Sequence, residues 1–116
     1  MEALDLLELE SRMTAAVEEL HKRSSAVAMS RQIKEYSSDM RKNLLAKFTA
    51  PLLKDNSATA AETLARANEQ YQGELEMQMD QYRTAEKHLA EWDALHCKFE
   101  ASRSALSLAR SQISLV

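Results

Sequence analysis

Apolar residues recur at intervals of three, four or seven over most of the chain, in two long stretches. The first covers residues 4–53 and contains a run at intervals of seven, formed by Leu6, Met13, Leu20 and Val27. The second covers residues 62–116 and follows Tyr71, Leu75, Tyr82, Leu89 and Trp92. Intervals of three and four place side chains on one face of an α-helix, whereas a strand repeats every two residues. Each stretch therefore predicts one long helix with an apolar stripe.

A short segment without this period separates the two stretches. It contains Pro51, the only proline, followed by the turn-forming residues 54–57. Proline disfavours helical geometry at the preceding residue and donates no backbone hydrogen bond. Thr59 and Glu62 have the spacing of a capping box, which begins a helix. The pattern predicts helix 1 over about 3–50, a turn over about 51–58 and helix 2 over about 59–114, as one helical domain.

A helix of about 50 residues is roughly 75 Å long and cannot bury its stripe against itself. The two stripes are therefore expected to pair, and a reversal centred near residue 55 would join residues whose numbers sum to about 110–112. The predicted fold is an all-α, long antiparallel helical hairpin, coiled-coil-like, that dimerises into a four-helix arrangement. The predicted helix–helix core is Leu6, Met13, Leu20, Val27, Ile33, Leu44, Phe48, Tyr71, Leu75, Tyr82, Leu89, Trp92, Phe99, Leu106 and Ile113.

Charge supports this pairing. Residues 1–20 and 55–100 are acidic, whereas residues 21–54 and 101–116 are basic. Folding back near residue 55 places each basic block opposite an acidic one, which favours antiparallel pairing over parallel or slipped alternatives. The same complementarity between two chains would produce a swapped dimer, so charge leaves hairpin and swapped dimer both open.

Composition narrows the class of protein. One glycine and one proline in 116 residues exclude a multi-stranded sheet, because its turns would lack their usual residues. The methionines are expected to fill a thin core, at Met13, Met29, Met40, Met77 and Met79. No apolar run approaches the length of a membrane span, and the acidic N-terminus does not resemble a signal peptide. With a single cysteine, Cys97, these features predict a cytoplasmic protein without an intrachain disulfide.

Two acid-x-x-His units form the sharpest chemical pattern. Glu18 precedes His21 on helix 1, and Asp93 precedes His96 on helix 2, at a spacing that puts both side chains on one helix face. Di-iron bundles combine two such units with further carboxylates from four helices. This chain offers two helices, so we expect no metal, with these four residues as the candidate set. His96 and Cys97 are adjacent and diverge by about 100° on a helix. We therefore expect no catalytic pair, no cofactor and a partly buried Cys97.

The basic middle of helix 1 is a candidate nucleic-acid surface. The least compensated bases lie near the tip of the predicted hairpin, at Lys42, Lys47, Lys54 and Arg66. Aromatic residues that would stack on bases do not interleave with them, so a solvated face neutralised by the opposite helix is the favoured interpretation.

The layout resembles the small helical proteins that bacteriophages and prophages encode in their early, recombination and replication regions. The resemblance rests on the acidic leucine-rich start at residues 6–10 and the Ala-Glu-rich segment at 57–67. It rests also on residues 99–107, followed by 110–113. It implies a phage or prophage origin and a host-cell cytoplasmic location, and it assigns no functional residue.

These observations predict a non-enzymatic interaction or assembly protein, an accessory to phage DNA recombination or replication that acts through an unknown protein partner and as a homodimer. Two alternatives stay open. One is direct nucleic-acid binding through the hairpin tip, and the other is a structural coiled-coil subunit of a secretion or virion assembly.

Overall fold

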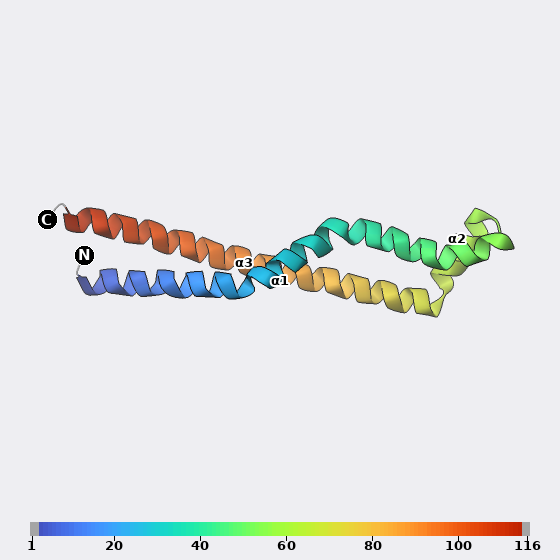
Figure 1. Ribbon diagram of the computed structural model, residues 1–116, viewed down its shortest axis with the longest axis horizontal. Coiled ribbons are helices and arrows are strands. Elements are labelled where there is room, and N and C mark those ends of the chain that lie inside the picture. Colours follow the sequence, from blue (N-terminus) through green and yellow to red (C-terminus); the bar gives the residue numbers. More distant parts are fainter. Residues whose placement is uncertain (1–2, 115–116) are drawn as a thin grey trace. The chain divides into compact units, whose positions relative to one another are not determined.

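The computed structural model describes residues 3–114, which form helices joined by short connections (Figure 1). Helix α1 spans Ala3–Thr49, the 3-10 helix η1 spans Ala50–Lys54, α2 spans Ala58–Ala67 and α3 spans Glu69–Ser114. No strand occurs within the described range. The prediction of an all-α helical hairpin is confirmed.

The chain divides into two compact units. Unit 1 contains α1 as far as Ala28 and α3 from His88 onward. Unit 2 is the continuous segment Met29–Lys87, with the rest of α1, η1, α2 and the beginning of α3. The sequence predicted one helical domain; each of the two units contains parts of both long helices.

Within unit 1, the beginning of α1 and the end of α3 lie side by side and run antiparallel (Figure 1). Glu10 pairs with Arg110 at 3.3 Å, and Arg23 pairs with Glu91 at 2.8 Å. Val27, Leu106 and Ala109 are buried in this unit. Ion pairs that are exposed or half-exposed, such as these two, contribute little energy. They nevertheless join the acidic and basic blocks that the sequence predicts to face each other.

Within unit 2, the two long helices are also antiparallel. Lys47 on α1 pairs with Glu74 on α3 at 3.5 Å. Phe48, the residue after Lys47, meets the Tyr71 ring edge to face, with 5.8 Å between ring centroids. The Lys34 ammonium lies 5.9 Å from the centroid of the Tyr82 ring, which is within cation–π range.

The observed register differs from the predicted one. A reversal centred near residue 55 would place Arg23 opposite residues 87–89, but it pairs with Glu91. Lys47 would lie opposite residues 63–65, but it pairs with Glu74. The difference in register arises because the reversal is longer than predicted. It includes α2, which packs against η1.

The start of α2 also corrects the sequence interpretation. Ser57, not Thr59, is the N-cap, and its hydroxyl accepts a hydrogen bond of 3.2 Å from the Ala60 amide. Thr59 lies inside α2, where its carbonyl accepts from the Thr63 hydroxyl at 3.0 Å. The predicted capping box with Glu62 is therefore wrong, because the helix begins two residues earlier.

The second helix is interrupted at Asn68, where the sequence predicted a continuous one. Asn68 has extended geometry, with φ −68° and ψ 126°. Its backbone amide donates to the Ala65 carbonyl at 3.1 Å and closes α2. Its side-chain oxygen accepts from the amides of Gln70 at 2.8 Å and Tyr71 at 3.2 Å. One asparagine therefore ends α2 and caps α3.

Replacing Asn68 with alanine should lower the free energy of unfolding by about 1 kcal/mol, because two amides at the start of α3 lose their acceptor. Asn68→Asp keeps an oxygen at that position and should retain most of the stability. Urea unfolding followed by circular dichroism measures both. If both variants lost the same free energy of unfolding, the side-chain oxygen at position 68 would not be what stabilises the start of α3.

Small side chains contribute core positions that the predicted helix–helix core did not include. Ala61 and Ala65 are 0% and 1% exposed on α2, while Ala85 and Ala109 are buried on α3. Conversely, Ile113 was predicted in the core and is 40% exposed. The other predicted core residues are buried or half-buried. The methionine prediction is wrong for four residues whose side chains are exposed: Met29, Met40, Met77 and Met79.

Gly73 lies inside α3 without a structural requirement for glycine. Its φ is not positive, and a Cβ placed there would meet nothing within 4 Å. Gly73→Ala should therefore raise the free energy of unfolding by about 0.5–1 kcal/mol, since glycine loses more backbone entropy on folding. Ala90→Gly, at an exposed position of the same helix, should lose a similar amount. Thermal unfolding of both variants tests this, and destabilisation by Gly73→Ala would contradict it.

Candidate functional site

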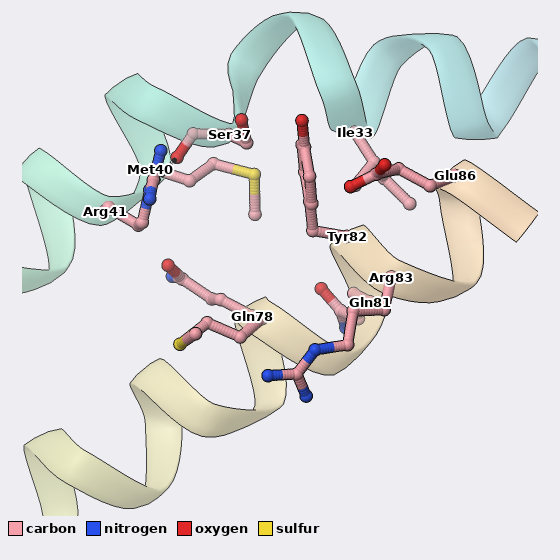
Figure 2. A pocket seen from close by; sticks show the side chains of 10 residues that line it. Ile33, Ser37, Met40, Arg41, Gln78, Gln81, Tyr82, Arg83 and Glu86 are labelled. Atoms are coloured by element: carbon pink, nitrogen blue, oxygen red, sulfur yellow. Dashed lines mark hydrogen bonds between the residues drawn. The ribbon is translucent and has the colours of Figure 1, made fainter.

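A groove opens between α1 and α3 within unit 2 (Figure 2). Its volume is about 350 Å³. The α1 wall is formed by Ile33, Ser37, Met40 and Arg41, and the α3 wall by Gln78, Met79, Gln81, Tyr82, Arg83 and Glu86. Figure 2 shows the Tyr82 ring rising from α3 toward α1, between Ser37 and Ile33. The groove therefore combines an aromatic ring, a branched side chain and two thioethers with a few polar groups.

The polar groups of this groove mostly bond within their own helix. The Ser37 hydroxyl donates to the Lys34 carbonyl at 3.1 Å, and the Arg41 Nε donates to the Ser37 carbonyl at 3.4 Å. On the other wall, Arg83 pairs with Asp80 at 2.8 Å. Each of these three contacts joins residues of one helix, so none of them crosses the groove.

Two methionines of the groove are accessible to solvent. Met40 is 36% exposed and Met79 is 43% exposed. Methionine is unbranched and polarisable, and it adapts to irregular apolar surfaces of a partner. A groove of this composition matches the sites in which the apolar face of an amphipathic helix binds.

Gln78 contributes a buried acceptor to the same groove. Its Oε1 is buried and has no hydrogen-bond partner among the described residues. An unpaired buried carbonyl costs free energy that an apolar replacement of similar shape avoids. Gln78→Met should therefore leave the free energy of unfolding unchanged or raise it by up to about 1 kcal/mol. Gln81→Met, at an exposed groove position, is the control for urea denaturation. If Gln78→Met lowered the free energy of unfolding and Gln81→Met did not, the Gln78 oxygen would have a hydrogen-bond partner in solution.

The candidate metal set does not form a ligand cluster in the structure. Glu18, His21, Asp93 and His96 are all exposed. Within residues 3–114, no three histidine, cysteine, aspartate or glutamate side chains gather closely enough to hold a metal ion. The acid-x-x-His spacing places two groups on one helix face, but the described residues complete no metal site there.

His96 instead belongs to a row of aromatic rings along α3. It stacks on Trp92 with 5.1 Å between centroids, and its centroid lies 6.3 Å from that of Phe99. Its Nε2 is 4.0 Å from a Glu100 carboxylate oxygen. Cys97 is exposed, which corrects the expectation of a partly buried thiol. These contacts assign packing to His96 and give it no nucleophile to activate.

The four candidate nucleic-acid residues lie on three helical elements of unit 2. Lys42 and Lys47 are on α1, Lys54 ends η1 and Arg66 is in the last turn of α2. Lys47 is compensated, because it pairs with Glu74 and lies 5.5 Å from the Phe48 ring centroid. The other three have no carboxylate within 4.0 Å in the part of the chain that the structure describes. They are the least compensated bases of the hairpin tip.

Comparisons with family models, curated proteins and solved structures find no match for this chain. None of the described helices has a stretch apolar enough to cross a lipid bilayer.

Proposed function

We propose that this chain is a non-enzymatic helical interaction protein that binds another protein, and a second copy of itself, through apolar side chains on its helix surfaces. The groove between α1 and α3 carries the proposal, because Met40 and Met79 line it and are exposed. Other large apolar side chains are also exposed on the helices, among them Leu7 and Leu108 in unit 1 and Met29 and Met77 in unit 2. A partner that covered these side chains would remove apolar area from water at about 25 cal/mol per Å².

The proposed setting is phage DNA recombination or replication, in the host cytoplasm, where the chain acts as an accessory through its protein partner. This setting comes from the sequence resemblance. The groove supports the mode of action, because a helix-in-groove contact needs no catalytic group.

A pull-down from prophage-bearing host cells tests the proposal. The bait is the full chain, and the test variant carries Met40→Glu and Met79→Glu, which place two charges in the groove. The matched control carries Asn43→Glu and Thr84→Glu, at exposed positions of the same helices outside the groove. We expect one specific protein to be captured by the wild type and the control and lost from the groove variant. Equal capture by all three chains, or no specific capture, would contradict the proposal.

The three uncompensated bases of the tip favour direct nucleic-acid binding as a second candidate function. Neutralising phosphates with bases releases counterions, so such binding would weaken steeply as salt rises. Titration of labelled single- and double-stranded DNA at two salt concentrations decides it. Absence of binding at low salt would remove this candidate.

A further inference from the structure

A second hollow, of about 410 Å³, lies in unit 2 where α1, η1 and α2 meet. Leu45, Ala46, Ala50 and Leu53 supply its apolar lining. Leu53 is 49% exposed on the 3-10 helix η1, beside α2. The hydroxyl of Thr49, which also lines the hollow, donates to the Leu45 carbonyl at 2.7 Å and is satisfied. The hollow therefore presents an apolar surface that the chain itself does not cover.

Charged side chains surround this apolar surface. Lys42 lines the hollow from α1, and Glu62 lines it from α2. Arg66 follows Glu62 by four residues, which places both on one face of α2. Neither Lys42 nor Arg66 has a carboxylate within 4.0 Å among residues 3–114. Residues 42–66 as a whole contain more basic than acidic side chains, with Lys42, Lys47, Lys54 and Arg66 against Asp55 and Glu62.

We propose that this hollow, which we call the tip hollow, docks an acidic amphipathic helix of a partner protein. A leucine or methionine of that helix enters between Leu45 and Leu53. Carboxylates one turn away on the same helix pair with Lys42 and Arg66. This arrangement places an apolar anchor and two charges at helical spacing on one partner element. The proposal rests on the proposed function of protein binding and names a second surface with its partner chemistry.

The lining distinguishes this partner from other occupants. Single-stranded nucleic acid binds through phosphates and stacked bases, but the lining of the tip hollow contains no aromatic side chain. A second copy bound through the same surface would place bases against bases, because a two-fold interface puts each patch against itself. An acidic partner with an apolar anchor matches the apolar lining and the two bases that are unpaired among the described residues, Lys42 and Arg66, which outnumber the one acid of the lining, Glu62.

A fluorescence anisotropy titration of the full chain tests the proposal. The probe is a labelled synthetic helix of about 20 residues, long enough for helicity in isolation, with leucines at heptad spacing and glutamates beside them. We expect Leu53→Glu and the double variant Lys42→Glu with Arg66→Glu each to weaken binding by at least about tenfold. Leu64→Glu, an exposed leucine of α2 outside the hollow, and Lys98→Glu, an exposed base of unit 1, should leave binding unchanged.

Three results would overturn the proposal. The wild-type chain fails to bind the probe; all variants bind it equally; or the chain prefers labelled DNA or anionic vesicles to the peptide, with binding that Leu53→Glu does not alter. Circular dichroism of each variant confirms that the helices are intact. A negative result in this titration does not change the result expected from the pull-down with the α1–α3 groove variant. The two experiments therefore test the two proposals independently.

Discussion

Replacing Leu106 with alanine is expected to lower the free energy of unfolding by about 2–4 kcal/mol, the largest stability loss of the variants considered. Leu106 is 2% exposed in unit 1. The substitution removes buried apolar atoms and leaves a cavity that the neighbouring helix fills only in part. A hairpin of two helices has a thin core with few residues to share such a loss.

Leu108 provides the matched control for this prediction. It lies two residues further along the same helix, and it is 60% exposed. Leu108→Ala should change the free energy of unfolding by no more than about 0.5 kcal/mol. Urea unfolding of the two variants at one protein concentration measures the difference. Similar losses for both would show that Leu106 is not buried against α1.

Replacing Ala61 with leucine is expected to cost about 1–3 kcal/mol, because α2 has no space for a larger side chain at this position. Ala61 is completely buried, and α2 packs against η1. Three additional heavy atoms would force α2 away from η1 or push neighbouring side chains off their preferred rotamers.

Ala67→Leu is the control, at the exposed last position of α2. It should shift stability by no more than about 0.5 kcal/mol. Thermal unfolding followed by circular dichroism distinguishes the two variants. A stable Ala61→Leu protein would mean that α2 is not docked as the structure shows.

The long helices were predictable because their signal is strong and local. The three-four period and Pro51 predict helix 1 over about 3–50, and α1 spans Ala3–Thr49. The charge blocks predicted the antiparallel direction, and ion pairs such as Glu10–Arg110 and Lys47–Glu74 join the expected blocks.

The reversal was not predictable from the same signals. Ser57 and Thr59 are both good N-cap residues, and only the backbone geometry selects Ser57. Asn68 interrupts a sequence of strong helix formers, and its capping role depends on a side-chain oxygen that a periodic pattern does not identify. The pairing register of α1 and α3 depends on these two features, because the helix between them, α2, lengthens the reversal.

The surfaces were harder to predict than the core. Periodicity finds the apolar stripe of a helix, but it does not show which part of the stripe the opposite helix covers. Met29 and Ile113 belong to the stripes and are nevertheless exposed. Ala61 and Ala65 of α2 are buried, although their small side chains contribute little to a hydrophobic pattern. The α1–α3 groove combines residues far apart in the sequence, so spacing alone did not indicate it.

Sedimentation equilibrium of the wild-type chain at micromolar concentration tests most directly whether exposed helix surfaces are covered by another chain. The chain has a mass of 13.1 kDa. The account predicts a mass twice that value, which falls toward the single-chain mass on dilution, as mass action requires. A single-chain mass at every concentration, in the absence of any captured partner, would contradict it.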